Sequence, residues 1–68
     1  MQLYRLLTGP DDSSFCHKVT KALNSGWRLY GSPSLAFDAE SGAMRCSQAV
    51  IKTVEGGEYD PAMKLGEQ

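Results

Sequence analysis

The residue types that most often do chemistry stand side by side at Cys16 and His17. A cysteine nucleophile needs a base within hydrogen-bonding distance, and histidine often fills that role. Both residues fall in a segment with helical periodicity, however, where adjacent side chains point about 100° apart. We therefore expect Cys16 to be a small buried apolar residue beside the apolar stripe of the helix, and His17 to be solvated.

A second candidate nucleophile is Ser32, which lies between Gly31 and Pro33 at an interruption of a strand pattern. No base stands near it in the sequence, so a backbone role is favoured. An enzyme that uses Cys16 or Ser32 is the least favoured hypothesis, and we expect no catalytic activity. Cys16, Cys46 and one histidine also fall short of a zinc motif, so we expect no metal and no cofactor.

Carboxylates occur in pairs at an expected helix start, an expected hairpin loop and the C-terminal segment. Capping of free N–H groups and solubility account for them at these places. General acid–base chemistry would need burial that such positions do not offer. The pairs are Asp11 with Asp12, Asp38 with Glu40, and Glu58 with Asp60.

Four residues form a candidate binding surface on the open face of the expected sheet: Arg5, Arg28, Tyr30 and Arg45. Arginines with an aromatic residue on an open sheet can hold single-stranded nucleic acid or another anion. Two alternatives remain open, a solvated face that keeps the sheet soluble and a surface for a partner. That partner would be a second copy of the chain or another protein. The net charge of −1 disfavours nucleic acid as the ligand of this face.

The stretch from 26 to 38 organises the fold, because its apolar residues alternate with polar ones. Trp27, Leu29, Leu35 and Phe37 share one side, which predicts a strand with one buried and one solvated face. Gly31 and Pro33 predict a bulge or bend within it.

A helix is predicted upstream of this strand, with Asp11 or Asp12 as its N-cap and the Ser25–Gly26 pair at its end. Gly26 suits the left-handed position after the last turn, from which Trp27 can fold back onto the helix. Its apolar stripe consists of Phe15, Val19, Ala22 and Leu23.

Two further strands complete the pattern. Residues 2–8 predict a first strand, with Tyr4 and Leu6 on one side and Leu3, Arg5 and Leu7 on the other. Residues 38–42 predict a hairpin loop, and 43–54 a third strand. One side of this third strand carries Met44, Cys46 and Val50, but the polar Gln48 interrupts that apolar set. The pattern therefore does not decide which side of the strand points inward.

The element order predicts an α+β fold, β-α-β-β, with a mainly antiparallel three-stranded sheet in the order 1-3-2. We expect the helix to pack on one face, over Trp27, Leu29, Leu35 and Phe37. The alternative order 3-2-1 places strand one parallel to strand two through a right-handed crossover. Residues 1–54 would form a single βαββ domain, and 55–68 a flexible tail.

With 68 residues the chain supports one domain with a thin core, so homodimerisation would add useful burial. No apolar run approaches the roughly 18 residues of a membrane span. The first residues lack the pattern of a signal peptide, so we expect a cytoplasmic protein with free thiols at Cys16 and Cys46.

The motifs Leu6-Leu7-Thr8-Gly9, Phe15-Cys16, Gly26 to Pro33 and Gln48-Ala49-Val50 resemble a small bacterial family, domain of unknown function 1737. The resemblance covers roughly residues 2–53. It implies a short βαββ domain without an assigned activity, and it brings no site residue to this chain. We therefore expect a non-catalytic protein-interaction module that can form a homodimer, with nucleic-acid or anionic-ligand binding on the open face as the alternative.

Overall fold

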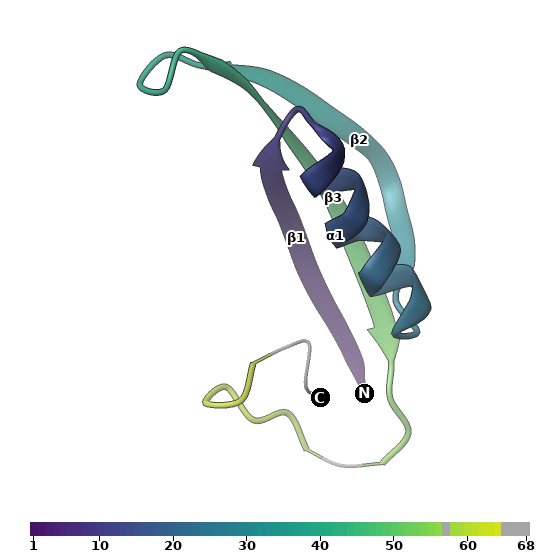
Figure 1. Cartoon of the computed structure of the whole chain (residues 1–68). Helices are drawn as coiled ribbons and strands as arrows, with labels where there is room; N and C mark the ends of the chain where they lie inside the picture. Colours follow the sequence, from purple (N-terminus) through teal and green to yellow (C-terminus); the bar gives the residue numbers. More distant parts are fainter. Residues whose placement is uncertain (57, 65–68) are drawn as a thin grey trace.

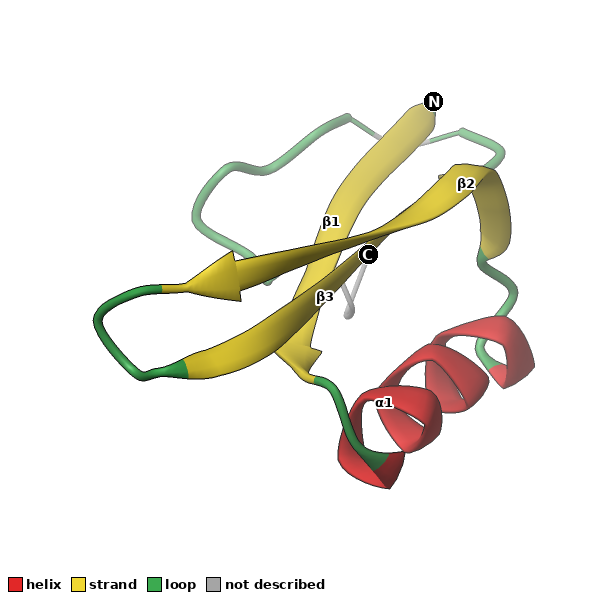
Figure 2. Ribbon diagram, turned by 90° about the horizontal axis from the view of Figure 1, so that it is seen from above, coloured by secondary structure: helices red, strands yellow, loops and turns green. Residues whose placement is uncertain are grey.

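The computed structural model describes residues 1–56 and 58–64. Its elements follow the order β1 (Gln2–Pro10), α1 (Ser13–Asn24), β2 (Arg28–Asp38) and β3 (Ala43–Thr53). The strands form one sheet in the order β1-β3-β2, and both neighbouring pairs are antiparallel. Helix α1 lies on one side of this sheet (Figures 1 and 2). The predicted α+β fold and the strand order 1-3-2 are confirmed, and the alternative with a parallel first pair is wrong.

Helix α1 begins and ends with the predicted local signals. Asp12 is the N-cap, and its Oδ1 accepts a hydrogen bond of 2.9 Å from the Ser14 N–H. At the other end Gly26 has a φ of +93°, a conformation that costs glycine little. The Trp27 N–H then donates to the Ala22 carbonyl at 3.1 Å. This closure turns the chain back onto the helix and places Trp27 directly before β2.

The register of β3 decides which side of the sheet faces α1. Val50 is fully buried and Gln48 is 5% exposed, so the even-numbered residues of β3 point inward. Their cross-strand partners on β1 are Arg5 and Leu7. Residues that pair directly across antiparallel strands share a face, so the odd-numbered residues of β1 also point toward α1.

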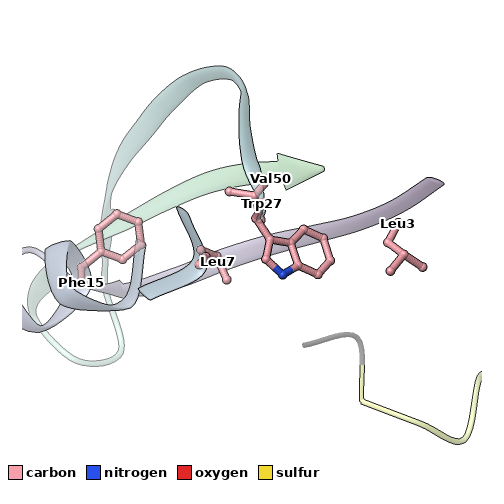
Figure 3. Close-up of a cluster of buried hydrophobic side chains, with 6 residues drawn as sticks. Leu3, Leu7, Phe15, Trp27 and Val50 are labelled. Atoms are coloured by element: carbon pink, nitrogen blue, oxygen red, sulfur yellow. The ribbon is translucent and has the colours of Figure 1, made fainter. Parts of the chain in front are cut away.

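The core lies between α1, β1 and β3, with the indole of Trp27 at its centre (Figure 3). Trp27 is only 2% exposed, as expected from the sequence. Gly9 lets Phe15 close one end of the core, because a Cβ at position 9 would lie 3.1 Å from Phe15 Cδ1. The buried apolar residues are Leu3, Leu7, Phe15, Ala22, Trp27 and Val50.

The helix does not cover β2, and this corrects the prediction that Leu29, Leu35 and Phe37 lie beneath it. These side chains are 52%, 57% and 65% exposed. A helix is about 10–12 Å wide, whereas strands lie about 4.8 Å apart, so one helix covers about two strands. Because α1 follows β1 after a short loop, the two covered strands are β1 and its neighbour β3. Leu23, predicted for the buried stripe, is also exposed.

The predicted interruption of β2 is a shift of register between Tyr30 and Ser34. The Gln48 side chain fills the hydrogen-bonding needs of this irregularity from the inward side of β3. Its Nε2 donates to the carbonyls of Tyr30 and Gly31, both at 3.3 Å, and to that of Ala49 at 2.8 Å. This explains why a polar residue occupies the inward face of β3 at this position. The Gln48 amide supplies a hydrogen-bond donor to the carbonyls of the β2 irregularity.

The described residues after β3 form no further helix or strand. Met1 and Val54 exchange backbone hydrogen bonds, which extends the β1–β3 ladder to residue 54. In residues 58–64 a single turn is closed by the Met63 N–H and the Asp60 carbonyl at 3.1 Å. A flexible tail over 55–68 stays a prediction, and its residues 57 and 65–68 lie outside the described part of the chain.

Candidate interaction surfaces

The two candidate nucleophiles, Cys16 and Ser32, both lie at the surface. Cys16 is exposed on α1, so its predicted burial is wrong, and His17 is exposed as expected. The groove that Cys16 lines between α1 and β2 contains no charged residue and no histidine. Ser32 is exposed at the β2 irregularity. Within residues 1–56 and 58–64, no group of three or more His, Cys, Asp or Glu residues is arranged to hold a metal ion.

Both cysteines are free, and Cys46 sits next to a carboxylate. Its Sγ lies 3.6 Å from Asp11 Oδ1. Desolvation, and secondly the negative charge of Asp11, raise the pKa of the Cys46 thiol above its ordinary value of 9.0. A raised pKa disfavours the thiolate, which is the reactive form of cysteine.

Three of the four predicted surface residues lie on the open face of the sheet. Arg28 and Tyr30 of β2 pair with Ile51 and Ala49, which are odd-numbered residues of β3, and Arg45 is itself an odd-numbered residue of β3. These positions point away from α1. On β1 the same face carries Tyr4 and Leu6, which are 54% and 55% exposed. The open face is therefore a mixed surface in which arginines flank exposed aromatic and aliphatic side chains.

Arg5 lies on the opposite side of the sheet, so its predicted place on the open face is wrong. It pairs with Val50, and its guanidinium carbon lies 5.4 Å from the centre of the Trp27 ring. Lys52 Nζ approaches the same ring at 5.8 Å. Leu3 and Leu7 are the buried residues of β1, and the alternation of the strand carries Arg5 inward with them.

A second surface lies where the sequence predicted core. We define the β2 strip as Leu29, Leu35 and Phe37 of β2 together with Met44 of β3. Leu35 pairs with Cys46, and Phe37 with Met44, so the strip shares the face on which α1 packs. Leu35, Phe37 and Met44 belong to the β2–β3 hairpin, which projects beyond the helix (Figure 2).

An apolar groove runs between α1 and the β2 strip. It has a volume of about 300 Å³, and Phe15, Val19, Leu29 and Pro33 are among its lining residues. Its remaining lining residues are neutral. The amphipathic periodicity of both elements indicated these apolar faces, but it did not reveal that they remain apart.

A polar groove lies on the other side of α1, between the helix and β1. Arg5, Lys18 and Lys21 line it together with Trp27. This site was not predicted from the sequence. The helical spacing of Lys18, Lys21 and Ser25 could have predicted it, because that spacing places the three residues on one side of α1.

Comparison with known proteins gives one match, to the family model described as Domain of unknown function (DUF1737), over residues 1–53. The chain belongs to this family. The matched region contains all four elements of the DUF1737 domain described above and ends with β3. No curated protein and no solved structure is a significant match. No helix in residues 1–56 and 58–64 is both long and apolar enough to cross a membrane.

Proposed function

We propose that this DUF1737 protein is a non-catalytic protein-interaction module that forms a homodimer through the β2 strip and the adjacent α1–β2 groove. One observation carries the proposal. Leu29, Leu35 and Phe37 have the inward register of the sheet, yet each is more than half exposed. Apolar surface that continues the core face without cover is typical of an interaction site.

The chemistry of this surface favours an apolar partner. No charged residue lines the α1–β2 groove, so a partner there would leave no lining charge desolvated. Burial of the strip would remove Phe37, Leu35 and Leu29 from water, and burial of apolar area is the main favourable term in association. The proposal therefore assigns affinity to the apolar residues of the strip.

A second copy of the chain is the partner that best fits these features. Strip and groove lie next to each other on one face, so a two-fold axis can place the strip of each copy on the groove of the other. The net charge of −1 adds little repulsion between copies. The described single-chain core contains six buried apolar residues, and a dimer would add to this small core.

The area that a stable dimer needs is a modest fraction of the surface of the chain. A stable interface buries about 800 Å² on each partner. The chain exposes 4941 Å², so such an interface would take about a sixth of its surface. The strip alone is narrow, and the proposed interface therefore includes the groove and the exposed Leu23 of α1.

Sedimentation equilibrium across the micromolar to millimolar range tests the proposal. We expect a dimer for the wild type and a monomer for Phe37→Ser, with unchanged circular dichroism. Tyr30→Ser is the matched control, because Tyr30 is 61% exposed against 65% for Phe37 but lies on the open face. The control should still dimerise.

Two outcomes would overturn this assignment. A wild-type chain that stays monomeric throughout the range removes the homodimer. Dissociation caused by Tyr30→Ser and not by Phe37→Ser moves the interface to the open face.

The alternative, nucleic-acid or anionic-ligand binding on the open face, keeps only part of its predicted residues. Arg5 lies on the other side of the sheet, and Arg28 and Arg45 remain with Tyr30 beside exposed apolar residues. Titration with a single-stranded oligonucleotide at low salt tests this alternative, since phosphate contacts are strongest there.

A further inference from the structure

The groove between β1 and α1 concentrates positive charge in a protein that is slightly acidic. Its volume is about 440 Å³, within the range of small-molecule sites. Arg5 extends into it from β1, and Lys18 and Lys21 from α1, whereas no Asp or Glu lines it. The groove is thus the place where the described chain gathers cations without acids.

The positions of two of these cations are fixed by neutral partners. The Arg5 guanidinium lies over the Trp27 ring at 5.4 Å. Lys18 Nζ spans from the helix to the strand and donates to the Thr8 carbonyl at 2.7 Å. These contacts hold both groups in place. Because neither contact neutralises the positive charge, both groups remain available to an anion.

A buried donor without an acceptor lies in the same wall. Trp27 lines the groove, and its Nε1–H is buried with no hydrogen-bond partner among the described residues. Buried polar groups in proteins nearly always have a hydrogen-bond partner, so this unpaired donor is unusual. In Figure 3 the indole nitrogen lies on the side of the ring away from Val50, and thus away from β3.

We propose that this groove binds a small organic molecule through a phosphate group. The guanidinium of Arg5 offers several donors in one plane, which suits the oxygens of a phosphate, while Lys18 and Lys21 add charge. The groove is larger than a phosphate ion needs, and its apolar lining at Leu7 and Ala22 accommodates an organic remainder. The site lies apart from the β2 strip and does not depend on the proposed dimer.

Proton–nitrogen correlation NMR of the full chain, titrated with phenyl phosphate at low salt, tests the proposal. Trp27 is the only tryptophan of the chain, so its indole N–H gives one assignable signal. We expect this signal and the amide signals of 6–8 to move and to saturate together. Lys21→Gln should weaken binding at least fivefold.

Arg28→Gln is the matched control, because it removes one positive charge from the open face and leaves the groove intact. Its dissociation constant should stay within twofold of the wild type. Absence of saturable movement of the indole signal overturns the proposal, and so does an equal loss of affinity in both variants. Inorganic phosphate that binds as tightly as phenyl phosphate would exclude the organic ligand, and phenol that binds equally well would exclude the phosphate contact.

Discussion

Leu29 of β2 and Val50 of β3 are direct cross-strand partners, yet Val50 is fully buried while Leu29 is 52% exposed. The two side chains point to the same side of the sheet. Their exposure differs because α1 packs over β1 and β3 and leaves the side chains of β2 uncovered. The same face of the sheet is therefore core at one strand and free surface at the next.

Truncation of these two partners should have very different effects on stability. Val50→Ala removes fully buried methyl groups, so we expect it to lower the free energy of unfolding by about 2 kcal/mol. Leu29→Ala should change it by about 0.5 kcal/mol or less in the monomer. Urea unfolding followed by tryptophan fluorescence, at a concentration where sedimentation shows monomer, measures both values.

Equal losses in the two variants would show that Leu29 is covered in the monomer. A loss for Leu29→Ala that grows with protein concentration would instead indicate that association buries this residue, as the proposed dimer requires.

The alternation from Trp27 to Phe37 was enough to predict an extended segment and its inward side. Both features are confirmed by the register of β2 with β3. Periodicity reports which residues share a face, but it contains no information on how wide the covering element is. The exposure of Leu35 and Phe37 therefore could not be predicted from it, because it depends on the position of α1 across the sheet.

The candidate site shows the same limit at Arg5. The sequence placed Leu3, Arg5 and Leu7 on one side of the first strand, which is correct, but the prediction that Arg5 lies on the open face is wrong. An arginine on the inward side is unusual unless a partner accepts it, and that partner is the ring of Trp27. This contact joins residues far apart in the sequence, so spacing alone could not reveal it.

Gln48 should be important for the geometry of the β2 irregularity. Gln48→Met keeps the length of the side chain but removes the donor, which leaves the carbonyls of Tyr30 and Gly31 without it. We expect a loss of about 1 kcal/mol in the free energy of unfolding, the usual net contribution of a hydrogen bond. Urea unfolding measures it, and amide exchange at residues 30–34 should become faster.

Ser47→Ala is the control for this variant, since Ser47 is the neighbouring residue of β3 and its side chain points to the open face. It should leave both stability and exchange close to the wild type. A Gln48→Met variant as stable as Ser47→Ala would contradict the role assigned to the buried amide.

The N-cap of α1 should make stability depend on pH in the acidic range below about 3.8. Hydrogen bonds from the Ser14 side chain and backbone lower the pKa of Asp12 below its ordinary value of 3.8. The unfolded chain then binds a proton at this group before the native chain does. The contribution of Asp12 is therefore present above about pH 3.8 and is lost as the pH falls through the lower pKa of the folded state.

Asp12→Asn separates the cap from its titration, because asparagine is an equally good N-cap but carries no charge to protonate. We expect its melting temperature to be near the wild-type value at neutral pH and to fall less on acidification below pH 3.8. Asp12→Ala should melt earlier already at neutral pH. Identical pH profiles for the wild type and Asp12→Asn would show that the charged form of Asp12 is not favoured by folding.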